Sequence, residues 1–374
     1  MRILHVVTMV SPDGAFGGPA RVTANLAVGL AGRGHEVLVA AGHLGYGAAG
    51  PPCDLDGAPA RLFPLRRISK AAGVSGLVSP SLLRWARAAL AQVDLVHVHL
   101  ARDLVTLPVA ALAVRRGVPL VLQPHGMVVP STHPLSTPLD AVLTRRVLRS
   151  AAAVLHLTRA EQEGLSAVAR GPIALRRLGN GVPCAADTPA PSGRPELLFC
   201  ARLQQRKRPL LFVRAAARLL HEGVDASFVL VGPDGGEGSA VRAAVAKVGD
   251  PDRLRWEGAL TPAQTLSRMA RASALVLPSV NEPYPMSVLE AMSVGRSVLV
   301  TQSCGLADAV RTHDCGVVVD ESLEGLVAGM QQLVVDAEGL ARRSGNAVCT
   351  ARGLFGMESV TDRLEQIYQA VARM

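Results

Sequence analysis

Residues 274–295 read ALVLPSVNEPYPMSVLEAMSVG, and this stretch contains the unit from which the rest of the chain is built. Its first residues, ALVLPS, form an apolar run of the length of a strand, and residues 286–294 have the pattern of a helix. An uninterrupted apolar run is typical of a strand that is buried on both faces of a parallel sheet. The stretch therefore predicts a strand, a short loop and a helix, in that order.

The same alternation of apolar runs and helical patterns recurs along all 374 residues. Strands are predicted at 2–8, 36–41, 94–99, 119–123, 153–157, 197–200, 226–232, 253–257, 274–278, 297–301 and 316–319. Helices are predicted at 19–32, 80–91, 102–115, 137–149, 159–167, 207–222, 236–248, 262–271, 286–294, 305–311, 322–335 and 355–373. This order predicts an α/β fold of two doubly wound, parallel-sheet domains of Rossmann type, with ligands at the carboxyl ends of the strands.

A change in composition divides the two halves. Residues 182–196, VPCAADTPAPSGRPE, are rich in proline, alanine and small polar residues and show no periodicity. We place the N-terminal domain at 1–184, the linker at 185–196 and the C-terminal domain at 197–354, and we expect 355–374 to pack back on the N-terminal domain as a helix.

The charge balance favours anionic ligands. The formal net charge is +9, and only three of the 39 basic residues are lysines: Lys70, Lys207 and Lys247. Phosphates or an acidic membrane surface suit such a charge, and the cluster of Arg66, Arg67 and Lys70 leaves open a peripheral contact with a membrane, or is a solvated loop. Aromatic residues are only 3% of the chain, so we expect no nucleic-acid partner.

Cysteine usage and hydropathy predict a cytoplasmic protein. Six cysteines are scattered without C-x-x-C pairs, and no His/Cys spacing resembles a metal site. The start, MRILHVVTMV, has the pattern of a strand and not of a signal peptide. The most apolar region, 104–122, is interrupted by Arg115, Arg116 and Pro119, so no transmembrane span is predicted.

Two glutamates flank the loop and helix of the opening stretch. Glu282 lies in the predicted loop, and Glu290 lies about one turn inside the predicted helix. Free N–H groups of the first helical turn, together with the helix dipole, form a site for a diphosphate. Carboxylates beside that site can accept hydrogen bonds from sugar or ribose hydroxyls. The alternative is a capped helix with an ordinary acid in its first turn.

Two further strand-to-loop segments add positive charge and backbone amides. In ARLQQRKRP, Arg202 offers a forked donor and the scarce Lys207 a point charge, the usual pairing for phosphate oxygens. The alternative is a surface loop in an arginine-rich chain. The backbones of VLVGPDGG (229–236) and WEGAL (256–260) could hold a nucleotide base, and the turn of the first contains Gly232, Pro233 and Asp234.

Taken together, these motifs resemble the family 4 retaining glycosyltransferases, which have the GT-B fold. The matching segments of the C-terminal half are NEPYPMSVLEAMSVG, ARLQQRKRP, VGPDGG, WEGAL and SCGLADAV. Those of the N-terminal half are GGPARVTANLAVGLAGRGHEVLV (17–39), DLVHVH (94–99), QPHGM (123–127) and LGNGVP (178–183). The resemblance covers nearly the whole chain, and the order Arg202, Lys207, Glu282, Glu290 is its most specific part. It implies an acceptor-side N-terminal domain, a nucleotide-sugar-binding C-terminal domain and a cleft between them.

The resemblance also implies roles for single residues in the C-terminal domain. Arg202 and Lys207 neutralise the donor diphosphate as it leaves, Glu282 binds donor sugar hydroxyls, and Glu290 binds the ribose. Many family members have glycine where this chain has Pro285, which has no N–H to offer. We therefore expect the phosphate to contact the first turn of the helix, at Met286, Ser287 and Val288.

Three residues of the N-terminal domain have implied roles as well. The amides of Gly17 and Gly18 contact phosphates, since a backbone without a side chain can approach a ligand closely. His125, at the end of a strand, meets the donor sugar near the reacting carbon, or is a polar residue satisfied by a neighbouring backbone. His97 and His99 alternate along one strand and share a face, where a structural role is expected.

The implied reaction moves a sugar from a GDP- or UDP-linked donor to a hydroxyl acceptor, with retention of the anomeric configuration. The acceptor is a small molecule, a saccharide or a lipid-linked saccharide. No metal or other cofactor is expected, since no Asp-x-Asp pair suited to a nucleotide-bound divalent ion stands in these motifs, and basic residues take its place. The 17–18 loop is expected to close on the donor.

Two other enzyme classes and one binding class compete with this interpretation. A dinucleotide-dependent oxidoreductase needs G-x-G-x-x-G after the first strand, and the glycines of PDGAFGGPA miss that spacing. A sugar-nucleotide epimerase of similar architecture would need acidic and histidine groups flanking the sugar, which the pair at 282 and 290 fits poorly. A non-catalytic sugar-nucleotide-binding subunit would bind donors without turnover.

Overall fold

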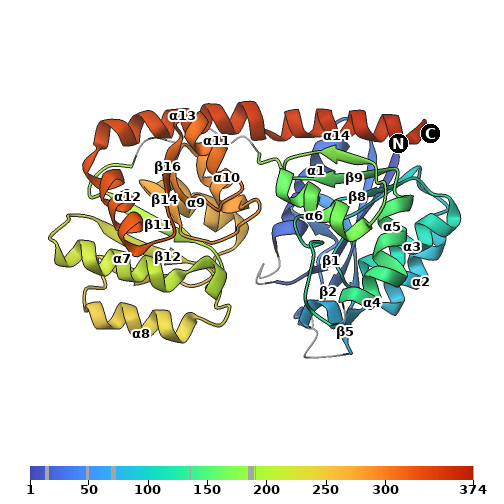
Figure 1. Cartoon of the computed structure of the whole chain (residues 1–374), viewed down its shortest axis with the longest axis horizontal. Coiled ribbons are helices and arrows are strands. Elements are labelled where there is room, and N and C mark those ends of the chain that lie inside the picture. Colours follow the sequence, from blue (N-terminus) through green and yellow to red (C-terminus); the bar gives the residue numbers. More distant parts are fainter. Residues whose placement is uncertain are drawn as a thin grey trace. The chain divides into compact units, whose positions relative to one another are not determined.

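The computed structural model describes residues 1–12, 17–47, 50–68, 73–134, 136–183, 189 and 191–373, and the chain divides into two compact units (Figure 1). The first unit comprises Met1–Gly181 and Met357–Met374, and the second comprises Val182–Gly356. Residues 185–188 and 190 of the predicted linker lie outside the described residues, as does Lys70 of the predicted basic cluster. Both units are parallel-sheet α/β domains, which confirms the predicted fold class.

The first unit is built on a sheet of eight strands in the order β10-β9-β8-β7-β1-β2-β4-β3. The central strand β1 pairs in parallel with β2 and β7, with Ile3 opposite Val37 and Leu95. The strands are β1 (Arg2–Val10), β2 (Glu36–His43), β3 (Asp54–Leu55), β4 (Ala58–Pro64), β7 (Leu95–Val98), β8 (Leu120–Leu122), β9 (Ala153–His156) and β10 (Leu175–Arg177). Only the β3–β4 pair is antiparallel within this sheet, and β5 (Arg66–Arg67) and β6 (Leu77–Val78) form a separate hairpin.

Helices cover both faces of this sheet. They are α1 (Gly17–Ala31), α2 (Pro80–Ala89), α3 (Thr106–Arg116), α4 (Ser136–Leu139), α5 (Arg145–Ser150), α6 (Arg159–Ala169) and α14 (Met357–Ala372), with a 3-10 turn at Gly73–Gly76 and a π-helical turn at Asp140–Thr144. Leu4 and Val6 of β1 pack in one core cluster with side chains of α2, α3, α5 and α6. His5, between them on the strand, faces the opposite side, because successive side chains alternate across a sheet.

The C-terminal helix α14 is held against α1 within the first unit. Glu365 pairs with Arg33 and with His35, each at 3.2 Å, and Arg33 also pairs with Asp362. A Cβ added at Gly29 would lie 2.5 Å from the hydroxyl of Thr361, so the two helices touch closely at that glycine. Helix α14 is therefore part of the same unit as β1.

The second unit is built on a six-stranded parallel sheet in the order β13-β12-β11-β14-β15-β16. Its strands are β11 (Glu196–Cys200), β12 (Ser227–Val231), β13 (Leu254–Trp256), β14 (Ala274–Leu277), β15 (Ser297–Thr301) and β16 (Gly316–Val319). Its helices are α7 (Pro209–His221), α8 (Gly238–Val248), α9 (Pro262–Arg271), α10 (Met286–Ser293), α11 (Ala307–Thr312), α12 (Leu323–Val335) and α13 (Ala337–Phe355), with a 3-10 turn at Gln205–Lys207. The cores on the two faces contain side chains of α7, α8 and α12, and of α9, α10, α11 and α13.

The predictions missed β3, β4, β5, β6, β10 and α13. No strand was predicted between residues 42 and 93, where β4 adds a parallel strand next to β2. The short strand β10 and the 19-residue helix α13 were also not predicted. The stretch over α13 contains three glycines and many polar residues, which weaken the pattern of a buried helix. Arg343 nevertheless lies on its buried face, because Asp314 and Asp336 neutralise its charge. In the described part of the chain, no helix is both long enough and apolar enough to cross a membrane.

Candidate functional site

The loop between β14 and α10 is held in a defined shape. Asn281 has a left-handed backbone, with φ of 49°, and its N–H donates to the hydroxyl of Ser303 at 3.0 Å. The carbonyl of Glu282 accepts from the N–H of Gly305 at 2.8 Å. The turn after β15 therefore fixes the backbone of the loop, and the side chain of Glu282 starts from a fixed position.

The structure brings Lys207 and Glu282, predicted separately, into contact. Nζ of Lys207 lies 2.5 Å from Oε2 of Glu282, and the side chains are 14% and 9% exposed. Burial lowers the pKa of Lys207, and the charge of Glu282 opposes that shift. Arg206, which the sequence analysis did not single out, reaches the same carboxylate oxygen at 2.9 Å. The site thus combines two cations and one anion in a partly desolvated corner.

Helix α10 begins directly after this loop. Pro285 is its N-cap residue, with φ of −72°, and the N–H of Val288 donates to the carbonyl of Pro285 at 3.2 Å. Val288 is buried and its amide already has a partner, whereas the N–H groups of Met286 and Ser287 have no acceptor within the helix. Glu290 is 7% exposed, so it lies on the buried side of the first turns.

The turn at Gly232, Pro233 and Asp234 lies against the start of the Arg202 loop. A Cβ added at Gly235 would lie 2.7 Å from Cγ of Arg202, so the stem of that arginine passes over the turn. The carboxylate of Asp234 accepts from the N–H groups of Gly236 and Gly238 at 2.8 Å, and the first of these bonds is the main cause of its lowered pKa. The side chain of Asp234 therefore shapes the turn itself.

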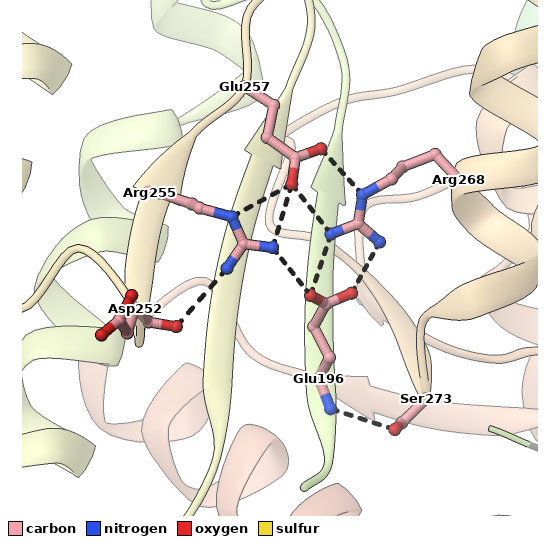
Figure 2. A network of polar contacts seen from close by, with 6 residues as sticks. All are labelled: Glu196, Asp252, Arg255, Glu257, Arg268 and Ser273. Carbon is pink, nitrogen blue, oxygen red and sulfur yellow. Dashed lines mark hydrogen bonds and ion pairs between the residues drawn. The ribbon is translucent and has the colours of Figure 1, made fainter. Parts of the chain in front are cut away.

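A network of ion pairs includes Glu257 of the predicted base-binding segment WEGAL (Figure 2). Arg268 of α9 makes a bidentate pair with Glu196 at 2.6 and 2.9 Å and also binds Glu257. Arg255 bridges the same two carboxylates, so that β11, β13 and α9 are joined. Glu257, Leu260, Arg268 and their neighbours on α9 line a hollow of about 340 Å³. The charges of this network are satisfied within it, so we assign it a structural role.

In the first unit, the structure places His125 in a strained turn directly after β8. Its φ is 52° and that of Gly126 is 75°. Glu161 holds this turn: its carboxylate accepts from the N–H of Gly126 at 2.5 Å and from that of Leu157 at 2.7 Å. Burial raises the pKa of Glu161. The sequence analysis missed Glu161, although Thr158-x-x-Glu161 before a helix is a capping-box pattern.

The imidazole of His125 belongs to a cluster of histidines. Its Nε2 lies 2.8 Å from Nδ1 of His99, and Nε2 of His99 lies 3.1 Å from Nδ1 of His5. Within the described part of the chain, the ring nitrogens of His5, His97 and His99 lie close enough together to form a candidate metal site. The rings of His97 and His99, however, lie 14° from parallel with centroids 4.5 Å apart. Stacked rings direct their lone pairs along separate planes and do not converge on one ion.

Burial of this cluster predicts that acid destabilises the first unit. Burial lowers the pKa of His5 from 6.5 to about 3 and that of His97 well below 6.5. The unfolded chain therefore binds more protons below about pH 6.5, and stability present above that pH is lost as the pH falls toward 3. Each such imidazole contributes a slope of up to about 1.4 kcal/mol per pH unit.

We expect His97→Phe to reduce this slope between pH 6.5 and pH 5. The measurement is the urea midpoint of unfolding across that range. His221→Phe, which replaces an exposed histidine, is the control and should leave the slope as it is. Equal slopes in the two variants would contradict a neutral, buried His97.

Gly17 and Gly18 lie in the first turn of α1, next to residues 13–16, which lie outside the described residues. Gly18 is exposed, and a Cβ added there would have no atom within 4 Å. Packing among the described residues therefore does not require glycine at 18, and its contact with phosphate stays a prediction.

Comparison with known proteins identifies the family. The profile of the family "Glycosyl transferases group 1" matches residues 185–348, and that of "Glycosyl transferase 4-like domain" matches residues 17–181. The chain is 32% identical over 284 residues to a 2-deoxystreptamine glucosyltransferase of Streptomyces kanamyceticus, covering 66% of this chain and 71% of that protein. It is 26% identical over 276 residues to an alpha-D-kanosaminyltransferase of the same organism, covering 68% and 71%.

Solved structures share the fold. Anabaena HepE in complex with UDP and glucose superposes with a TM-score of 0.78 at 18% identity, covering 99% of this chain and 100% of that one. A sucrose-phosphate synthase from Thermosynechococcus elongatus gives a TM-score of 0.79 at 18% identity, with 99% of each chain covered. At this identity they establish the GT-B fold, and the sequence relatives establish the family. The chain is therefore a glycosyltransferase and belongs to the group 1 glycosyl transferases.

Proposed function

We propose that this glycosyltransferase moves a sugar from a nucleotide diphosphate sugar to an acceptor hydroxyl, with retention of configuration and without a metal ion. The proposal depends on one observation, the contact between Lys207 and Glu282 directly before the first turn of α10. It places an ammonium group suited to a diphosphate beside a carboxylate suited to sugar hydroxyls. The resemblance to retaining family members supports the stereochemistry.

The main catalytic contribution is electrostatic. As the bond between the sugar and the diphosphate breaks, negative charge grows on the phosphate oxygens and the sugar becomes oxocarbenium-like. Lys207, Arg202 and the first-turn amides of α10 meet that charge, and preorganised groups of this kind supply a large part of enzymatic rate enhancement. The charge of Glu282 opposes the fall that burial causes in the pKa of Lys207, and so favours the protonated form.

The remaining steps involve the acceptor and the first unit. The acceptor hydroxyl attacks from the face that the diphosphate leaves, and a phosphate oxygen takes the hydroxyl proton. His125 contacts the donor sugar, Glu290 binds the ribose, and the amides of Gly17 and Gly18 contact phosphate. Asp234 acts through the shape of its turn, because its carboxylate is occupied by Gly236 and Gly238.

The relatives suggest which donor and acceptor to test first. Anabaena HepE has been crystallised with UDP-glucose, and a Streptomyces relative is named for glucosyl transfer to 2-deoxystreptamine. Other relatives are named for transfer to D-inositol 3-phosphate. We therefore propose a UDP-linked hexose as the first donor, with GDP-linked sugars as the alternative, and small polyhydroxylated rings as the first acceptors. Saccharides and lipid-linked saccharides form the second set.

A donor panel tests the proposal. The chain is incubated with UDP-glucose and other UDP- and GDP-sugars in the presence of EDTA, with and without acceptors, and products are followed by mass spectrometry. We expect transfer or slow donor hydrolysis with one donor, and an anomeric coupling constant in the product that shows retention. Binding without turnover would instead support a non-catalytic subunit. Activity that is lost in EDTA and restored by Mg²⁺ or Mn²⁺ would contradict the metal-free scheme.

A further inference from the structure

Four histidines and one tyrosine form a continuous chain of hydrogen bonds in the first unit. From His125 the chain passes through His99 at 2.8 Å to His5 at 3.1 Å, then to the hydroxyl of Tyr368 at 3.3 Å and on to His97 at 2.6 Å. His5, His97, His99 and Tyr368 have no exposed surface, whereas His125 at the end of the chain is partly exposed. These hydrogen bonds thus connect the buried face of helix α14 to a predicted site residue.

We propose that this chain of hydrogen bonds is a relay that sets the tautomer of His125, with Nε2 as the acceptor and the single N–H at Nδ1. His5, His97, His99 and Tyr368 are positioning residues for His125. The contact of His125 with the donor sugar rests on the proposed function, but the tautomer does not.

The protonation state of each member limits the relay to two directions. Burial lowers the pKa of His5, His97 and His99, so each ring is neutral at neutral pH and has one donor and one acceptor nitrogen. Burial also raises the pKa of Tyr368 well above 10, so the phenol keeps its proton. Every member must therefore donate one hydrogen bond and accept one. The donors of the relay then all point toward His125 or all point toward His97.

The unpaired nitrogen at the far end selects the direction. Among the residues that the structure describes, Nε2 of His97 has no hydrogen-bond partner. If protons are donated from His97 toward His125, that nitrogen is an unprotonated acceptor. In the reverse direction it would carry a buried N–H without an acceptor, and orphaned buried N–H groups are rarer than under-satisfied acceptors. The forward direction places the proton of His125 on Nδ1.

The backbone of His125 is held independently. Glu161 binds the N–H of Gly126, while His99 binds the ring. The two contacts together determine both the position of the imidazole and which nitrogen carries hydrogen. An N–H at Nδ1 makes the ring a hydrogen-bond donor, which suits a sugar oxygen.

Nuclear magnetic resonance of the full chain with ¹⁵N-labelled histidine tests the tautomer directly. Two-bond ¹H–¹⁵N correlations distinguish Nδ1–H from Nε2–H rings, and the His125→Gln variant assigns the His125 signals by their loss. We expect the Nδ1–H tautomer at His125. An Nε2–H tautomer in the unaltered chain would overturn the relay, whatever the activity.

His99→Phe tests the origin of the effect. It replaces the imidazole by an aromatic ring and removes the donor to Nε2 of His125, so His125 should show a mixture of tautomers. We expect kcat with the active donor to fall about tenfold, the size typical of residues that orient a functional histidine. His221→Phe, which replaces an exposed histidine of the second unit, should change neither readout.

The outcomes separate this inference from the proposed function. A pure Nδ1–H tautomer in folded His99→Phe would overturn the relay, and a changed tautomer with an unchanged kcat would overturn the positioning role. If no donor is turned over by the unaltered chain but the tautomers behave as expected, the relay stands and the proposed function fails.

Discussion

Replacement of Lys207 by alanine is expected to lower kcat/KM for the nucleotide sugar by about 10²- to 10³-fold while the fold persists, the range found when one charge-stabilising donor is removed. Lys207 is 14% exposed and lies 2.5 Å from Glu282, so its ammonium acts in a partly desolvated place where a charge has a large effect. The loss should appear in kcat more than in KM, because the charge on the diphosphate grows in the transition state.

Stability is expected to change little in this variant. Glu282 keeps Arg206 at 2.9 Å, so removal of the lysine does not leave the carboxylate without a partner. Lys247→Ala, at an exposed lysine on α8 of the same unit, is the matched control and should be as active as the unaltered chain. A folded Lys207→Ala protein with nearly normal kcat/KM would refute the assigned role.

Gly232→Ala is expected to destabilise the second unit severely. The φ of Gly232 is 143°, and a Cβ there would lie 2.0 Å from the carbonyl oxygen of Ala201 at the end of the neighbouring strand. Backbone strain of about 1–3 kcal/mol and overpacking of about 1–3 kcal/mol together predict a loss of about 2–6 kcal/mol in the free energy of unfolding. The measurement is the thermal or urea midpoint of the second unit.

Gly236→Ala separates the two causes. Its φ is 113°, but a Cβ there would meet no atom within 4 Å, so only the backbone strain should remain. Gly232→Ala should therefore be the less stable of the two variants. Equal stability would show that the approach of β12 to β11 can relax, and that glycine at 232 is needed for its conformation alone.

Much of the fold could be predicted from local patterns. The apolar runs that became β1, β14 and β15 are buried on both faces, and such runs are recognisable in any context. The pattern failed for β4, whose residues alternate between buried and more exposed positions, and for α13, whose buried face includes a neutralised arginine. Arginine is mostly a surface residue, so the sequence alone predicts that it is exposed. Its burial can be recognised only when its acidic partners are known.

The site residues also differ in whether local sequence could predict them. Lys207, Glu282 and His125 were predicted from motifs, in which neighbours along the chain identify a residue. Arg206, Glu161, His5 and Tyr368 were not, because their relevance depends on contacts between distant segments. Tyr368 and His97, for example, are 271 positions apart in the sequence.

The sequence alone predicted the class of fold and the family, and it contained the residue types that we propose to meet a diphosphate and a sugar, because apolar periodicity and motif spacing are local properties of the chain. Only the tertiary structure decided that Lys207 shares Glu282 with Arg206, and that a helix at the end of the chain supplies a hydroxyl to the histidines behind His125. The reason is physical: a hydrogen bond or a buried ion pair depends on distances of a few ångströms, which are set only when the segments pack together.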